Sequence, residues 1–201
     1  MTPSPVPTTA PAFEHPPTAV GYRRLMLRRR MWLAAFLCLL AVLVWIAAEL
    51  SLPDRAIPLF IVVLLLCPVL VLASAAALLC TPRTARILQS YVWQEYPCSY
   101  PPRGQRRDFV VVVTVAPGHE VTLHTTPYRH NLQHKRDPHP GVIWFAGDPH
   151  SGGVVSPVGG HAPLRVASTA LWDRDPQLPP ADAVAERAGL ARDGRYVRRW
   201  F

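Results

Sequence analysis

Two long uncharged stretches constrain this chain more than any other feature of its sequence. Residues 31–48 form a run of 18 residues without a formally charged side chain, and residues 57–80 form a run of 24. At a helical rise of about 1.5 Å per residue, these runs extend roughly 27 and 36 Å, against a hydrocarbon core of about 30 Å. We therefore expect two membrane-spanning helices, 31–48 and 57–80. The short link, 49–56, can only join antiparallel neighbours, so residues 22–80 should form a helical hairpin.

The positive charge of the chain is concentrated beside these runs. The net charge of the chain is +8. Five arginines from Arg23 to Arg30 immediately precede the first run, and further arginines follow the second. In the link, Arg55 is offset by Asp54. Because positively charged flanks stay in the cytoplasm, we expect a multi-pass membrane protein with both termini cytoplasmic. The lipid bilayer is then the first expected partner, and the basic charge gives no reason to expect nucleic acid.

The composition suggests a bacterial plasma membrane as the location. Of the 21 basic residues, only Lys135 is a lysine, and Ala, Val, Pro and Leu are abundant, as in proteins from high-GC bacterial genomes. A cleaved signal peptide is the alternative, since a basic region precedes an apolar run that ends in the small residues Ala47 and Ala48. The long leader, the length of the apolar run and the second run directly afterwards favour retained helices instead.

The two ends of the chain differ from its middle. Residues 1–21 contain six prolines together with Thr, Ser and Ala, and no apolar periodicity, which predicts a disordered tail. Residues 171–201 form a C-terminal segment in which one helix is expected over 181–191, after Pro179-Pro180. This segment ends in arginines interleaved with aromatic residues, a pattern that suits an anionic lipid surface or a last packed strand.

Residues 87–170 predict a small, mostly β, cytoplasmic domain. Short runs rich in β-branched and aromatic residues alternate with Pro and Gly clusters and predict five or six strands. The expected strands cover residues 92–100, 108–115, 120–125, 142–147, 153–156 and 164–167. Turn residues at Pro117-Gly118 and Gly159-Gly160 favour hairpins. A barrel or a compact sandwich fits, and the continuous run Val110 to Val113 suggests the strand that is covered on both faces.

Seven of the eight histidines lie between His119 and His161, which raises the question of a metal site. On a helix, His130 and His134 would share one face, and His139 could add a third ligand, as in catalytic zinc sites. Pro138 and Pro140 interrupt that segment, however, and the spacing matches no established ligand motif. We therefore expect solvated loop histidines and neither a metal nor another cofactor.

Other catalytic patterns are equally short of support. Asp148, His150 and Ser151 stand together, but residues this close in one turn rarely point at each other, and the segment lacks the GxSxG elbow. The phosphate-binding patterns GxxxxGK[ST] and GxGxxG do not occur in the sequence. We accordingly predict no catalytic, cofactor-binding or metal-ligating residue, and no enzymatic activity.

Two segments carry a family resemblance. The helical hairpin is followed by Tyr91-Val-Trp-Gln-Glu-Tyr-Pro-Cys98 and by Val142-Ile-Trp-Phe-Ala-Gly-Asp-Pro149. Over residues 22–170 this outline resembles small actinobacterial two-helix integral membrane proteins of unknown function. The resemblance implies a plasma membrane of Gram-positive type and implies no catalytic residue.

These observations predict a membrane-anchored, non-catalytic interaction or scaffolding module, whose β domain binds a protein partner or a second copy of the chain. A metal-dependent membrane-anchored enzyme that uses the His119 to His161 segment is the first alternative. An accessory subunit of a transporter is the second, but neither apolar run contains the ionisable residue that marks most transport pathways.

Overall fold

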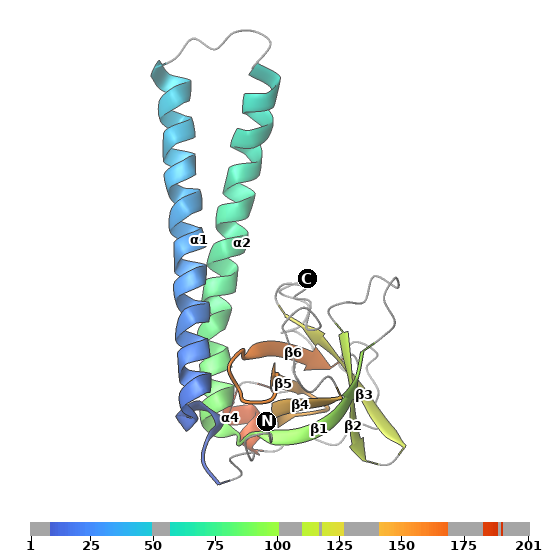
Figure 1. Ribbon diagram of the computed structural model, residues 1–201. Coiled ribbons are helices and arrows are strands. Elements are labelled where there is room, and N and C mark those ends of the chain that lie inside the picture. The colour runs from blue at the N-terminus through green and yellow to red at the C-terminus, as the bar shows by residue number, and fades with distance from the viewer. Residues whose placement is uncertain are drawn as a thin grey trace. The chain divides into compact units, whose positions relative to one another are not determined.

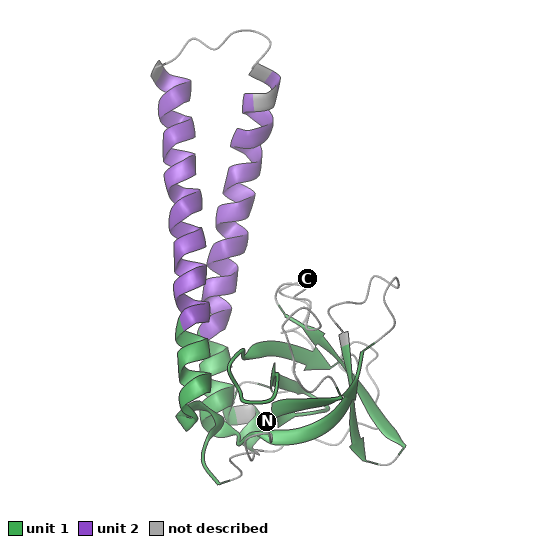
Figure 2. Cartoon of the chain, viewed as in Figure 1, with its two compact units in different colours: residues 1–23, 82–201 green, residues 24–81 purple. Residues whose placement is uncertain are grey.

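The computed structural model describes residues 9–49, 57–100, 110–116, 118–126, 141–168, 183–188 and 190. The chain forms two compact units: residues 1–23 together with 82–201 make one, and residues 24–81 make the other (Figure 2). In chain order the elements are η1 (Ala12–Glu14), α1 (Pro16–Glu49), α2 (Ile57–Ser90), β1 (Gln94–Ser99), β2 (Val110–Ala116), β3 (His119–Thr125), β4 (Val142–Asp148), β5 (Gly152–Ser156), β6 (Leu164–Ser168) and α4 (Ala183–Arg187) (Figure 1).

The unit of residues 24–81 is an antiparallel pair of long apolar helices, as the two uncharged runs predict. Both helices are long and apolar enough to cross a membrane, and 0% and 11% of their apolar windows are buried inside the protein. Neither is therefore the core helix of a globular domain. The Sγ atom of Cys67 donates to the carbonyl oxygen of Phe36 at 3.5 Å, which brings the middle of one helix beside the middle of the other.

One arginine adds a stronger connection between these helices. Nη1 of Arg29 donates to the carbonyl oxygen of Ala77 at 2.7 Å and to Oγ1 of Thr81 at 2.7 Å. The hydroxyl of Thr81 in turn donates to the carbonyl oxygen of Ala77 at 3.0 Å. Because a hydrogen bond from a charged donor is about twice as strong as a neutral one, these contacts fix which turn of α1 faces which turn of α2.

Both helices extend beyond the predicted spans 31–48 and 57–80. Helix α1 begins at Pro16, and α2 continues past Pro82 to Ser90. Proline is favoured in the first turn of a helix, where its fixed φ fits and its missing N–H costs nothing. Further along α1, residues 23–30 are all Arg, Leu or Met, which are good helix formers.

The strands of the other unit form a closed antiparallel barrel. Within the described residues the barrel has six strands in the order β1-β2-β3-β6-β5-β4. All six overlap the strands expected from the sequence, and the closed order decides for a barrel against a sandwich. Closure pairs β1 with both β2 and β4, so that neither side of the sheet is left as a free edge.

The barrel interior is an apolar core to which the inward side chains of successive strands contribute. Phe145 of β4 and Leu123 of β3 are completely buried in it. The core comprises Val111, Val113, Val121, Leu123, Ile143, Phe145, Val155, Leu164 and Val166, with Tyr96, Cys98, Tyr100 and Val115 packed against it. On β2, Val111 and Val113 are buried and Val112 is only half-buried, so this strand is not the one covered on both faces.

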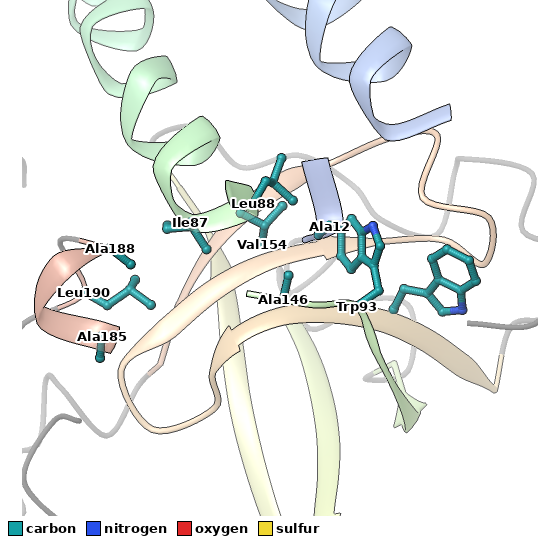
Figure 3. Close-up of a cluster of buried hydrophobic side chains, with 10 residues drawn as sticks. Ala12, Ile87, Leu88, Trp93, Ala146, Val154, Ala185, Ala188 and Leu190 are labelled. Atoms are coloured by element: carbon teal, nitrogen blue, oxygen red, sulfur yellow. The ribbon is translucent and has the colours of Figure 1, made fainter. Parts of the chain in front are cut away.

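Strand β4, together with its neighbour β5, is covered on both faces instead. Ile143 and Phe145 face the barrel interior, while Trp144 and Ala146 belong to a second cluster outside it. This outer cluster comprises Ala12, Ile87, Leu88, Trp93, Trp144, Ala146, Val154, Ala185, Ala188 and Leu190, so η1, the last turns of α2 and the region of α4 meet over β4 and β5 (Figure 3). The sequence predicts a helix over 181–191, and α4 with the residues after it supplies its part of this cover.

The N-terminal residues differ most from the sequence-based expectation of disorder over residues 1–21. Residues 1–8 lie outside the described part of the chain, but Pro11 forms an antiparallel bridge with Val92. The backbone N–H of Ala12 donates to the carbonyl oxygen of Tyr91 at 2.8 Å, and the Ala12 side chain is completely buried. The expectation was wrong for residues 11–21, because contacts with the barrel unit stabilise a segment that is too short and too rich in proline to fold alone.

This contact set predicts what an N-terminal deletion will do. Removing residues 1–20 should leave insertion into membranes intact, since the arginines from Arg23 to Arg30 remain. It should, however, remove part of the apolar cover of β4 and expose the outer face of that strand. We expect a lower melting temperature and a weaker near-UV circular dichroism signal than in the full chain. Removing residues 1–8 alone keeps all the described contacts and serves as the control. Equal melting temperatures for the two deletions would contradict the role given to residues 11–20.

Candidate functional site

The most elaborate polar arrangement in the described residues lies where residues 11–21, which we call the N-terminal clamp, cross two tryptophans. Nε1 of Trp93, just before β1, donates to Oγ1 of Thr18 in the first turn of α1 at 3.1 Å. Both side chains are completely buried. A buried indole N–H needs such an acceptor, because leaving it unpaired costs about 1–3 kcal/mol. Thr18 therefore joins the start of α1 to the barrel unit.

His15 and Trp144 extend this arrangement and leave two polar atoms without a partner. The ring of Trp144 lies 6.0 Å from that of Trp93 and 5.4 Å from that of His15, with the histidine at its edge. Nε1 of Trp144 and Nδ1 of His15 have no hydrogen-bond partner among the described residues. Burial lowers the pKa of His15 below its ordinary value of 6.5, so the imidazole is neutral at pH 7. A neutral imidazole suits a position beside an indole N–H, where a cation would lack an acceptor.

Two glycines allow the clamp to approach the β5–β6 turn closely. At Gly160, which has a φ of 69°, a Cβ would lie 2.5 Å from Oγ1 of Thr18 and 3.4 Å from Nδ1 of His15. At Gly21, a Cβ would collide with the backbone carbonyl of His161 and lie 2.9 Å from Cδ of Pro163. Gly21 thus lies against the backbone of the turn and Gly160 lies against clamp side chains, and a larger residue at either position would separate the clamp from the turn.

The described histidines of the sequence cluster lie in different strands and turns. His124 lies within β3, opposite Val110 of β2 and Ala167 of β6, and His161 is exposed in the β5–β6 turn. His130, His134 and His139, the candidate ligands of the metal hypothesis, lie outside the described residues. His15, far away in sequence, is instead the histidine that packs on a core tryptophan.

One pair of histidines does come together. The rings of His119, at the start of β3, and His150, in the β4–β5 turn, lie 5.3 Å apart. Among the described residues no group of three or more His, Cys, Asp or Glu side chains is arranged to hold a metal ion. Elemental analysis of the purified chain, with His130→Ala as the comparison, remains the way to test the metal hypothesis.

The segment that suggested a hydrolase is a turn closed by its own aspartate. Oδ1 of Asp148 accepts from the backbone N–H of His150 at 3.0 Å, and Oδ2 accepts from the hydroxyl of Ser151 at 2.6 Å. The serine hydroxyl is thus bonded to the carboxylate, whereas nucleophilic activation requires an imidazole acceptor. This is the Asx geometry by which aspartate stabilises turns, and it agrees with the interpretation of these residues as a glycine-rich turn.

A tyrosine stands at the same end of the barrel as this turn. Tyr96 packs edge-on against Phe145, with ring centroids 6.0 Å apart, and its hydroxyl donates to Oε1 of Gln94 at 2.6 Å. Burial, with a further contribution from the negative charge of Asp148, raises the pKa of Tyr96 above its ordinary value of 10.0. The phenol therefore stays protonated at neutral pH and acts as a hydrogen-bond donor rather than as a base.

The arrangement as a whole suits attachment better than reaction. Thr18, Trp93 and Gly160 join the clamp to the barrel unit, and Asp148 stabilises a turn. Sequence reasoning missed the clamp, although Pro16-Pro17 followed by Thr18 is a recognisable helix start. In the sequence, Trp93 and Trp144 stand out only as parts of the motifs that carry the family resemblance.

Comparison of the chain with protein-family models, with curated proteins and with solved structures found no match.

The close approach at Gly160 can be tested against a matched glycine. Gly160→Ala should combine the cost of a left-handed backbone, about 1–2 kcal/mol, with crowding against Thr18. Gly118, with a φ of 78°, has the same kind of backbone but no atom within 4 Å of an added Cβ. In urea unfolding of the detergent-solubilised chain, we expect Gly160→Ala to lose at least about 1 kcal/mol more than Gly118→Ala. Equal losses of unfolding free energy would show that the N-terminal clamp moves to accommodate the added methyl group at no energetic cost.

Proposed function

We propose that this chain is a membrane-anchored, non-catalytic interaction module. Helices α1 and α2 span a bacterial plasma membrane as a hairpin with both termini in the cytoplasm, and the barrel presents a binding surface to a protein partner or to a second copy of the chain. The main support for this proposal is that β4 is covered on both faces. The barrel interior and one outer face are therefore filled by packed side chains. What remains for recognition is the outer face of β1, β2, β3 and β6.

Membrane anchoring is supported by the helices themselves. Their exposed large apolar side chains, among them Leu65, Leu72 and Leu79 at 68–69% exposure, would face water in a soluble protein. Contiguous apolar surface of this extent marks a membrane or an interface. The arginines that flank the apolar runs support a cytoplasmic location for both ends.

The outer face of β1 is the best candidate for the binding surface. Glu95, Pro97 and Ser99 point outward and are exposed, while Tyr96 and Cys98 alternate with them towards the core. Glu120 of β3 adds a second exposed carboxylate in the same sheet. Because β1 is paired on both sides, recognition at this face would rest on its outward side chains.

Crosslinking tests this surface. A photoreactive residue placed at Glu95 or Ser99, in cells that make the full chain, should give a discrete crosslinked species in the membrane fraction. Glu95→Arg should abolish that species when the probe is at Ser99, because a reversed charge in a specific interface costs several kcal/mol. The same probe at Gln89, an exposed residue of α2 outside this face, is the control. An identical crosslink from Gln89, or none from Glu95 and Ser99, would refute the proposed surface.

The proposed orientation makes an independent prediction. A phosphatase reporter that is active only outside the cytoplasm should be silent when fused after Arg107 or Phe201 and active when inserted near Pro53. A cytoplasmic fluorescent reporter should give the opposite pattern, because the bias of arginines towards both flanks holds both ends inside. Phosphatase activity at Phe201 would place the barrel outside and refute a cytoplasmic partner.

A further inference from the structure

The arginines at the start of the apolar part of α1 fall into two structural classes. Arg29 is half-buried, and its guanidinium binds α2. Arg24, Arg28 and Arg30 are exposed in the same unit, while Arg23, which is also exposed, belongs to the barrel unit. Arg24 and Arg28 are one helical turn apart and therefore share a face, whereas Arg30 lies about 200° further round the helix from Arg28, on nearly the opposite side. One arginine thus serves the helix pair, and three project away from it.

Neither helix supplies a counter-charge for the three exposed arginines. Residues 15–48 and residues 57–90 contain no aspartate or glutamate. Like charges one turn apart destabilise a helix, so Arg24 and Arg28 are an unfavourable pair unless anions from outside the chain neutralise them. A guanidinium binds phosphate and carboxylate alike through two parallel N–H donors, so the surroundings of the arginines must decide between these anions.

The side chains around these arginines indicate where the phosphates lie. Leu27, Met31 and Trp32 are 60%, 63% and 52% exposed, so large apolar groups alternate with the charges. An exposed indole beside arginines is typical of a membrane–water interface. From Arg24 to Arg30 the helix rises roughly 9 Å. The headgroup layer on one side of a bilayer is a few ångströms thick, so arginine side chains along this stretch can all reach it. Uncharged residues begin immediately afterwards, at Met31.

We propose that Arg24, Arg28 and Arg30 bind the phosphate groups of anionic phospholipids, so that the hairpin gathers these lipids around its cytoplasmic end. The proposal rests on the membrane anchoring proposed above and adds a lipid class to it. The hydrocarbon stems of the arginines lie along the apolar surface while the charged groups reach the headgroups. Arg29 is set apart from them, because its Nη1 donates to Ala77 and Thr81 of the neighbouring helix.

Lipid retention by the full chain tests the proposal. The protein is reconstituted into nanodiscs of equal parts anionic phosphatidylglycerol and zwitterionic phosphatidylcholine, re-extracted in mild detergent, and analysed for retained lipid by mass spectrometry. Orientation is immaterial in a nanodisc, so effects on topology do not enter. We expect the wild-type chain to retain phosphatidylglycerol in preference to phosphatidylcholine. This preference should fall about fivefold for each arginine replaced in the series Arg24→Gln, Arg28→Gln and Arg30→Gln.

Two matched variants separate binding from general effects. Lys135→Gln removes one positive charge from a position 55 residues beyond the second apolar run and should leave the preference for phosphatidylglycerol unchanged. Replacement of the three exposed arginines by lysine keeps the charge but loses the bidentate geometry, and should give an intermediate preference. A short single-stranded oligonucleotide added in excess should not displace the lipid.

The outcomes distinguish this proposal from the anchoring on which it depends. Release of the chain from membranes by alkaline carbonate would overturn the anchoring and the lipid proposal together. Stable membrane association without a preference for phosphatidylglycerol, or a preference that the triple glutamine variant retains, would overturn the lipid proposal alone. Displacement of the lipid by the oligonucleotide would assign the arginines to nucleic acid and would also overturn it.

Discussion

The burial of β4 on both faces is the constraint on which the rest of the barrel unit depends. Phe145 fills the barrel interior, so the strand must alternate, and the same alternation points Trp144 and Ala146 outward. Two adjacent large aromatic residues on opposite faces cannot both be covered by a single sheet. The outward one needs a second layer, and three segments that are far apart in sequence provide it: the N-terminal clamp, the last turns of α2 and the region of α4.

The elements of this fold were largely predictable, because each has a local signal. The two helices follow from the length of the uncharged runs, and the strands follow from β-branched residues between turn residues. The identity of the doubly covered strand was not predictable. The valine run at 110–113 looks more uniformly apolar than β4, whose Gly147 and Asp148 give it a mixed character. Which strand receives a cover depends on where the helix ends attach, and no local pattern encodes that.

The clamp shows the same limit in another form. Composition alone indicates disorder for a segment with six prolines among 21 residues. The positions of the prolines matter more than their number: Pro11 lies at an isolated bridge, and Pro16 starts a helix. The contacts that stabilise the segment, such as Thr18 with Trp93, join residues 75 positions apart. Similarly, histidines that are neighbours in sequence separate in the described fold, while His119 and His150 meet across two hairpin turns.

Arg29 gives the helix pair a common reference level. Its bonds to Ala77 and Thr81 place the start of the first apolar run beside the end of the second. From that level the apolar part of α1 extends for about 20 residues and that of α2 for about 24, roughly 30 and 36 Å. Both lengths are close to one hydrocarbon thickness, so the two helices can share a single bilayer with modest tilt. A guanidinium placed elsewhere along α1 would offset the two runs and leave part of one of them in the headgroup layer or in water. The interaction that holds the helices together therefore also aligns their apolar lengths with each other.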